Sequence, residues 1–175
     1  IIPEEGSLLL VNKPKSWTSF DVVNKLRYLL KIKKIGHAGT LDPLASGLLL
    51  IGVGKYTKKL ESLQGLDKTY EGIIEIGKTT PSFDLETPFD SSSDYMHVTP
   101  QQIAVAVEAL TGELDQIPPI YSAIKVNGQR AYKSARKNEI IELKSRKIKV
   151  YKFEITRVHL PEIHFRVVCS KGTYI

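Results

Sequence analysis

The sequence has only one cysteine, and no apolar run approaches the roughly 20 residues that a membrane-spanning helix needs. Its first residues lack the basic start and long apolar centre of a secretory signal peptide. Cys169 has no second cysteine with which to form an internal disulfide, as is usual in a reducing compartment. We therefore expect a cytoplasmic protein that is not attached to a membrane.

The patterns of two common classes of site are also missing. A metal site needs ligands at characteristic spacings, and neither Cys169 nor the four histidines provide them: His37, His97, His159 and His164. Gly54-Lys55 resembles the end of a phosphate-binding loop, but that motif needs a glycine five residues earlier and Ser or Thr after the lysine. Leu49 and Tyr56 occupy those positions. We therefore expect no metal and no cofactor.

Positive charge is concentrated in two segments. The net charge is +6, but residues 125–152 alone contain ten basic and two acidic residues, a local excess of +8. A second group of basic residues has no acid among them: Lys25, Arg27, Lys31, Lys33 and Lys34. Such segments are either solvated surface or a surface that binds a polyanion. Two of them in one chain favour contact with the phosphates of a nucleic acid.

Hydrophobic patterning predicts strands and helices in an irregular order. Strands are expected over residues 8–11, 48–53, 68–76, 147–158 and 163–169, with helices over 18–30, 55–63 and 99–110. Residues 77–98 are rich in Thr, Ser, Pro and Asp and are expected to form a loop. Helices inserted irregularly between strands indicate an α+β fold rather than a doubly wound one, and 175 residues suffice for roughly one domain.

Two helix starts carry local signals. Thr18 is followed three residues later by Asp21, in the manner of a capping box, although Asp replaces the usual Glu or Gln. Thr99 is followed by Pro100 and then by Gln102, which completes a second capping box. Gly112 is expected to end this second helix.

The segment from Gly36 to Gly47 is the strongest candidate for a site. It reads Gly-His-Ala-Gly-Thr-Leu-Asp-Pro-Leu-Ala-Ser-Gly and is expected to form a loop with special backbone requirements. Pro43 restricts Asp42 to an extended conformation, which would hold its carboxylate in a fixed position. From these residues alone, Asp42 is either a catalytic carboxylate or part of an ordinary Asp-Pro turn.

Five blocks of sequence resemble one enzyme family. "GHAGTLDPLASGLLLIGVGKYTK" is similar to the catalytic motif of the TruB family of tRNA pseudouridine synthases. Four more blocks match in the same order: "LLLVNKPKSWTSFDVVNKLR", "DKTYEGIIEIG", "IPPIYSAIKVNGQRAYKSAR" and "CSKGTYI". The resemblance implies a mixed, mostly antiparallel sheet with flanking helices and a central RNA-binding cleft. It also implies isomerisation of uridine to pseudouridine at position 55, in the T loop of tRNA, after the base is flipped out.

The resemblance assigns roles to individual residues. Asp42 corresponds to the catalytic aspartate, and either nucleophilic attack or abstraction of a ribose proton is open to it. The substrate-binding residues that it implies are Tyr70, His37, Tyr174, Lys13 and Lys68. The resemblance implies that Tyr70 stacks on the target base, whereas without the resemblance Tyr70 reads as an ordinary strand tyrosine of the core.

Residues 118–144 match an RNA-binding insertion of the family, its thumb. The contact residues expected there are Tyr121, Ser122, Lys125, Arg130, Tyr132 and Arg136, which combine positive charge with aromatic rings. The family motif continues one residue further, as "KGTYIR", with an arginine that pairs with the catalytic aspartate. We therefore expect residues 1–175 to be an incomplete catalytic domain without the family's C-terminal RNA-binding domain, and to be weakly active or inactive alone.

An alternative function remains open. Basic segments and exposed aromatic residues serve a non-catalytic module that binds and remodels tRNA equally well. Asp42 distinguishes the two possibilities, because a module that only binds RNA gains nothing from a carboxylate facing phosphates. In either case the expected partner is the T-arm stem-loop of tRNA, with no obligate protein partner.

Overall fold

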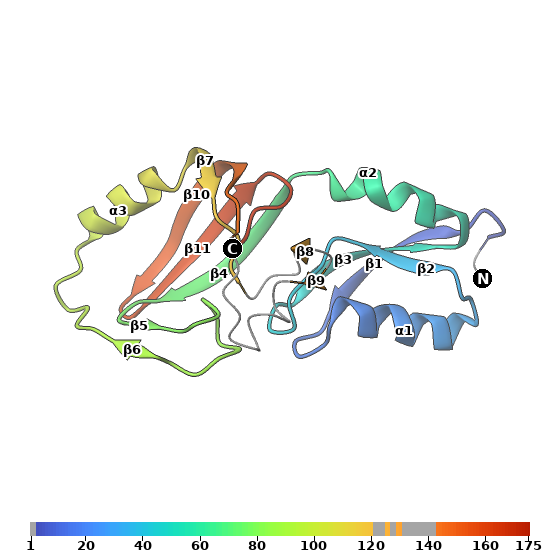
Figure 1. The fold of residues 1–175 in the computed structure, drawn as a ribbon, viewed down its shortest axis with the longest axis horizontal. Helices are drawn as coiled ribbons and strands as arrows, with labels where there is room; N and C mark the ends of the chain where they lie inside the picture. The colour runs from blue at the N-terminus through green and yellow to red at the C-terminus, as the bar shows by residue number, and fades with distance from the viewer. Residues whose placement is uncertain (1–2, 121–124, 127–128, 131–142) are drawn as a thin grey trace. The chain divides into compact units, whose positions relative to one another are not determined.

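The computed structural model describes residues 3–120, 125–126, 129–130 and 143–175. Within it the chain forms two compact units, Ile1–Leu66 and Asp67–Ile175, drawn in blue to cyan and in green to red in Figure 1. Strand pairing in the described residues is antiparallel throughout, and helices lie irregularly between the strands. The α+β class predicted from the sequence is therefore confirmed.

The first unit is a three-stranded sheet with helices around it. Its elements are β1 (Ser7–Lys13), α1 (Ser19–Leu30), β2 (Ile35–Ala38), β3 (Gly47–Val53), a 3-10 helix (Gly54–Lys59) and α2 (Leu60–Gln64). The strand order is β1-β3-β2, so β3 lies in the centre. Its apolar run is buried between two neighbours, which explains why this stretch reads as continuous hydrophobic sequence.

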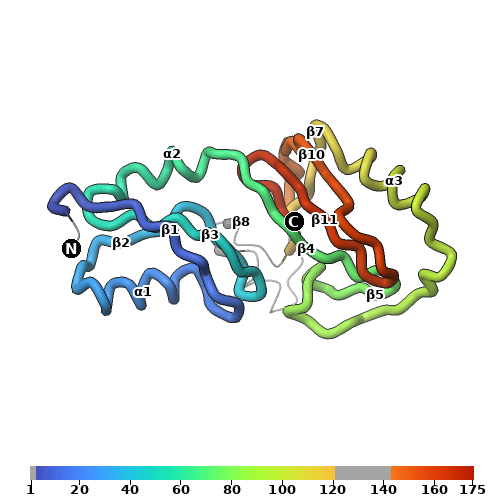
Figure 2. Tube along the Cα trace, turned by 180° about the vertical axis from the view of Figure 1, so that it is seen from behind, coloured from blue at the N-terminus to red at the C-terminus, as the bar shows by residue number. Residues whose placement is uncertain are grey.

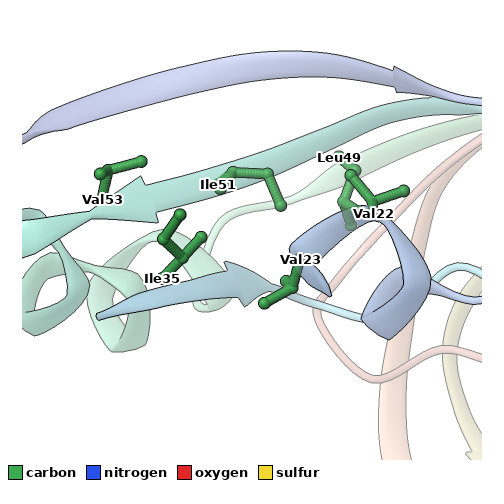
Figure 3. Close-up of a cluster of buried hydrophobic side chains, with 6 residues drawn as sticks. All are labelled: Val22, Val23, Ile35, Leu49, Ile51 and Val53. Carbon is green, nitrogen blue, oxygen red and sulfur yellow. The ribbon is translucent and has the colours of Figure 1, made fainter. Parts of the chain in front are cut away.

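The core of the first unit lies between α1 and the sheet. Figure 3 shows the six buried side chains, which point toward one another from α1, β2 and β3: Val22, Val23, Ile35, Leu49, Ile51 and Val53. Val22 and Val23 are the buried residues of α1, Leu26 and Leu30 pack against the cluster from the same helix, and Leu29 is exposed. Burial of one β-branched pair on α1 thus fixes which side of the helix faces the sheet.

The second unit contains a four-stranded antiparallel sheet of order β4-β11-β10-β7. Its described elements are β4 (Lys68–Glu75), β5 (Lys78–Thr79), β6 (Ser91–Ser92), α3 (Pro100–Ala109), β7 (Gly112–Gln116), β8 (Lys125–Val126), β9 (Gln129–Arg130), β10 (Arg146–His159) and β11 (Glu162–Cys169). Figure 2 shows β4, β11 and β10 side by side. Helix α3 contacts β10. A turn at Leu160-Pro161 joins β10 to β11, as the sequence predicted.

One face of this sheet carries the second core. It consists of buried residues from β10 and β11: Ile148, Val150, Phe165, Val167 and Cys169. The ring centroids of Phe153 and Phe165 lie 5.5 Å apart in an edge-to-face arrangement, which is favourable for aromatic pairs. Cys169 is fully buried, and burial raises the pKa of its thiol. It therefore behaves as a core residue, as its position in an apolar strand indicated.

Both predicted capping boxes are confirmed, whereas the predicted end of the helix that begins after Thr99 is wrong. Thr18 accepts a hydrogen bond from the amide of Asp21, and Thr99 accepts one from the amide of Gln102. This helix, α3, ends at Ala109 rather than at Gly112, which begins β7 instead.

Among the described residues, every helix is too short or too polar to cross a lipid bilayer.

Candidate active site

The backbone around Asp42 is held by the last residue of β1 and by residues that follow this strand. The Nζ atom of Lys13 donates hydrogen bonds to the carbonyl oxygens of Trp17 at 2.6 Å, Pro14 at 3.1 Å and Pro43 at 3.4 Å. The side chain of Lys13 is fully buried, so these carbonyls replace the water that its ammonium group would otherwise bind. Lys13 thus ties the end of β1 to the residue directly after Asp42.

A second residue holds the other side of Asp42. Ser19 is buried at the start of α1, and its hydroxyl donates to the carbonyl oxygen of Leu41 at 3.2 Å. The same hydroxyl accepts from the amide of Leu41 at 2.9 Å. The amide of Ser16 donates to the carbonyl oxygen of Pro43 at 2.7 Å. The residues before and after Asp42 are therefore both fixed, although these contacts involve no atom of Asp42.

Asp42 itself is exposed at the start of a tight turn. Its carbonyl oxygen accepts a hydrogen bond from the amide of Ala45 at 3.1 Å. Gly39 and Gly47 bracket the turn with φ angles of +87° and +122°, a region that side chains rarely adopt. The result is an accessible carboxylate on a backbone with little freedom, the geometry that displays a reactive group.

The electrostatics of the first unit centre on Lys13. Burial lowers the pKa of its ammonium group below the usual 10.5, and the carboxylates of Asp42 and Asp21 act in the opposite direction. Hydrogen bonds from the side chain and backbone of Thr18 lower the pKa of Asp21. The carboxylate of Asp42 therefore interacts favourably with the buried cation of Lys13.

His37 lies in a strand rather than in a loop. It belongs to β2, where it pairs with Ile51 of β3, so the expectation that residues 36–38 form a loop is wrong. The cause is pairing with the central strand β3 along Ile35–Ala38, which outweighs the low strand preference of glycine and alanine. The Nδ1 atom of His37 donates to the carbonyl oxygen of Gly39, which orients the ring.

Three more residues assigned by sequence belong to the second unit. Lys68 and Tyr70 are half-buried on β4, where they pair with Cys169 and Val167 of β11. Tyr70 packs against the core of that unit, so part of its ring is used for stability. Tyr174 follows β11 and is half-buried. The structure thus brings Lys13 and His37 to the Asp42 segment, and describes Lys68, Tyr70 and Tyr174 in a unit of their own.

Two side chains that the sequence did not single out hold Tyr174. The side-chain amide of Gln116 donates to the carbonyl oxygen of Tyr174 and accepts from its amide, both at 2.9 Å. The guanidinium carbon of Arg146 lies 4.6 Å from the centroid of the Tyr174 ring. Glutamine at the end of a strand is a common residue, and no local pattern could have marked it as a partner for a residue 58 positions away.

The expected thumb residues are only partly described. Lys125 and Arg130 lie in β8 and β9 and form one register pair. The other four candidates lie outside the described residues: Tyr121, Ser122, Tyr132 and Arg136.

Several basic residues after the thumb have acidic partners. The Nζ atom of Lys149 lies 3.4 Å from the carboxylate of Glu113, and that of Lys152 lies 2.7 Å from Glu154. Lys147 is opposite Asp115 in the β7–β10 register. Three of the four basic residues at the start of β10 therefore lie beside or opposite an acidic residue.

The basic residues between Lys25 and Lys34 have two different roles. The guanidinium of Arg27 donates to the carbonyl oxygens of Lys33 at 3.1 Å and Ile35 at 3.0 Å, so it fixes the turn after α1. The lysines of the cluster are exposed. An open hollow of about 420 Å³ lies beside them, lined by Arg27, Lys31, Ile32 and Lys33. In the part of the chain that is described, no three His, Cys, Asp or Glu side chains gather to hold a metal ion.

Two solved complexes contain chains with a similar fold. The chain aligns with a chain of "a Cbf5-Nop10-Gar1 Complex" at a TM-score of 0.71 and 27% identity, covering 99% of this chain and 45% of the other. It also aligns with a chain of an "H/ACA RNP bound to a substrate RNA containing 2'-deoxyuridine" at 0.68 and 23%, covering 98% and 40%. The chain therefore spans less than half of either chain.

Curated relatives are more similar in sequence. The tRNA pseudouridine synthase B of Flavobacterium johnsoniae is 57% identical over 178 residues, which cover 98% of this chain and 78% of that protein. The protein of the same name from Chlorobaculum tepidum is 45% identical over 180 residues, covering 100% and 75%. Residues 27–175 match the model of the TruB family pseudouridylate synthase N-terminal domain. Together with the shared fold, this match shows that the chain belongs to the TruB family of pseudouridylate synthases.

Proposed function

We propose that this chain isomerises uridine to pseudouridine in tRNA, at position 55 of the T loop, with Asp42 as the catalytic carboxylate. Membership of a pseudouridylate synthase family supports the reaction. The name tRNA pseudouridine synthase B, carried by a relative 57% identical to this chain, supports tRNA as the substrate. The position within tRNA and the role of Asp42 rest on the motif that surrounds this residue.

The reaction needs no redox partner and no second substrate. The N1–C1′ glycosidic bond of uridine breaks, the uracil turns within the site, and a C5–C1′ bond forms. The hydrogen at C5 leaves as a proton, and N1 gains a proton, so that product and substrate are isomers. A carboxylate can start this sequence either as a nucleophile or as the base that takes a proton from the ribose.

The observation that carries the proposal is the fixed backbone on both sides of Asp42. Ser19 holds Leu41 through two hydrogen bonds, and Lys13 and Ser16 hold Pro43. A carboxylate whose approach to a sugar must be accurate benefits from such rigidity, because an error of about 1 Å can lower a rate about 100-fold. An ordinary exposed Asp-Pro turn has no need of a buried lysine beneath it.

The other assigned residues have supporting roles in this proposal. Tyr70 stacks on the flipped base, Tyr174 borders that base, and His37 and Lys68 contact the RNA. Lys13 fixes the backbone next to Asp42 through its hydrogen bond to the carbonyl oxygen of Pro43. The thumb residues bind the RNA backbone and bases, and the chain acts in the cytoplasm, where a lone buried cysteine stays reduced.

The test is release of tritium from a T-arm hairpin labelled at C5 of its uridines, measured with the protein at its full natural length. Wild-type protein is expected to release tritium, and Asp42→Asn is expected to release none while binding the hairpin with nearly unchanged affinity. Asp115→Asn is the matched control, since the proposal gives this exposed carboxylate on β7 no role, and the substitution should leave both properties unchanged. Binding without release by the wild-type protein would favour the RNA-binding module instead.

A further inference from the structure

The backbone of Tyr174 is held as if it were part of a sheet, but its partner is a side chain. The Nε2 atom of Gln116 donates to the carbonyl oxygen of Tyr174, and Oε1 of the same amide accepts from the amide of Tyr174, each at 2.9 Å. Both polar backbone groups of Tyr174 are thereby satisfied by one residue. A primary amide is suited to this role because it offers one donor and one acceptor side by side.

Arg146 holds the same segment from the ring side. Its guanidinium carbon lies 4.6 Å from the centroid of the Tyr174 ring, within the range of a cation–π contact. Its Nη2 atom donates to the carbonyl oxygen of Gly172. The Nε atom of Arg146 is buried with no hydrogen-bond partner among the described residues, which is unfavourable. Arg146 therefore loses hydrogen bonding at its Nε atom, and its contacts with Gly172 and Tyr174 explain why it occupies this position.

These two residues face each other in the sheet. Arg146 and Gln116 are partners in the β7–β10 register, and they form its last pair. The start of the segment is fixed independently, because Ser170 exchanges hydrogen bonds with Lys149: its hydroxyl accepts from the Lys149 amide at 2.9 Å, and its amide donates to the Lys149 carbonyl at 2.8 Å. Residues 170–174 therefore follow a path set at both ends by β10 and β7.

We propose that Gln116 and Arg146 are positioning residues that fix the ring of Tyr174 for the isomerisation reaction. This inference rests on the proposed function, in which Tyr174 borders the base. The alternative is that the pair only tethers the chain after β11 and contributes to stability alone. The two interpretations differ in whether the rate of the reaction depends on Gln116 through the Tyr174 ring.

A double-mutant cycle separates these interpretations. Single-turnover tritium release at saturating hairpin is measured for wild-type protein, Gln116→Ala, Tyr174→Ala and the double variant, all at full natural length. We expect Gln116→Ala to lower the rate roughly 10-fold in the wild-type background, and less than about twofold once the ring is absent, since the effects of residues that act through one group are not additive. Hairpin affinity should change less than about threefold.

Conservative variants and a control complete the experiment. Gln116→Glu keeps the acceptor for the Tyr174 amide but loses the donor, so it should give an intermediate rate. Arg146→Lys keeps the charge but not the planar group, and should lower the rate with the same dependence on Tyr174. Gln101→Ala, at an exposed position of α3, should match wild type.

Two results would overturn the inference. Equal rate losses for Gln116→Ala with and without the Tyr174 ring would show that Gln116 does not act through it, and so would an unchanged rate in Gln116→Ala. Absence of release by the wild-type protein would instead remove the proposed function on which the inference rests, so the two failures are distinguishable.

Discussion

The hydroxyl of Ser19 contacts both polar backbone groups of Leu41, a residue 22 positions later in the sequence. Ser19 is the first residue of α1, and Leu41 precedes the proposed catalytic carboxylate. The start of α1 is fixed by the capping box of Thr18 and by the burial of Ser19, Val22 and Val23. The Asp42 segment takes its position from that point rather than from its own glycine-rich sequence.

Ser19→Ala should reduce catalysis and stability together. Loss of the hydroxyl leaves the amide and carbonyl of Leu41 without this partner, which should lower the free energy of unfolding by about 1–3 kcal/mol. If the hydroxyl also positions Asp42, tritium release should fall roughly 10- to 100-fold with little change in hairpin affinity. Denaturant unfolding and single-turnover release measure the two effects. Ser46→Ala, at an exposed position of the same turn, is the control and should change neither.

Lys13→Met should be strongly destabilising, although methionine fits a buried space of similar length. Three carbonyl oxygens lose a charged donor, which should lower the free energy of unfolding by about 2–4 kcal/mol. Lys15→Met is a matched control two residues away, because Lys15 is exposed. Equal midpoints of denaturant unfolding for the two variants would argue that the Lys13 hydrogen bonds contribute nothing.

The pKa of Lys13 gives this site a defined pH dependence. Its folded-state pKa is lowered from 10.5 by burial, so between that lowered value and 10.5 the unfolded chain binds more protons than the folded one. Stability from this group therefore rises as the pH increases through that window, and the unfavourable contribution is present below it. The difference in unfolding free energy between wild type and Lys13→Met should accordingly grow toward alkaline pH. A difference that stayed constant would contradict the lowered pKa.

The two capping boxes should respond differently to acid. Removing either cap, by Thr18→Ala or Thr99→Ala, should cost about 1 kcal/mol at neutral pH. Hydrogen bonds from Thr18 lower the pKa of Asp21 below 3.8, so their stabilisation is present above 3.8 and is lost as the pH falls through the folded-state value. The cost of Thr18→Ala should therefore shrink in acid, whereas Thr99, whose partner Gln102 does not titrate, should show a constant cost. Parallel pH series of chemical unfolding would test this.

The salt dependence of RNA binding should change when basic residues of the thumb are replaced, and should not change when lysines of β10 are replaced. Replacing Lys125, Arg130 and Arg136 by Ala should flatten the plot of log affinity against log salt by roughly one unit for each RNA phosphate that the variant no longer neutralises. Lys149→Ala and Lys152→Ala are the controls, because each of these lysines already has an acidic partner. Identical slopes for the two sets would indicate that the thumb charges face solvent.

Local signals in the sequence were sufficient for some parts of the fold. Both capping boxes involve residues three positions apart, and the central strand β3 is a continuous apolar run, so each could be predicted without knowledge of the rest. The strand β7 could not, because Gly-Glu-Leu-Asp-Gln has two acids and becomes a strand only by pairing with Arg146–Val150. Strand β2 was missed for the same reason, since its glycine suggested a loop until β3 provided a partner.

In the candidate site, too, some residues could be predicted from the sequence and others could not. Asp42, Lys13 and His37 stand in recognisable motifs, and the structure groups the latter two with the Asp42 segment. Ser19, Gln116 and Arg146 were not predicted, because their contacts join side chains to the backbone of distant residues. Such contacts leave no periodic pattern, and the residue types involved are common everywhere in proteins.

The burial of Lys13 also makes it a chemical reporter. Its amine is closed to solvent while the neighbouring Lys15 is open, so an amine-reactive reagent should modify Lys15 at once and Lys13 only when the structure around it opens. One of the carbonyl oxygens that it binds belongs to the segment that presents Asp42. The labelling of Lys13 in the wild-type protein therefore reports how readily the segment that presents Asp42 opens.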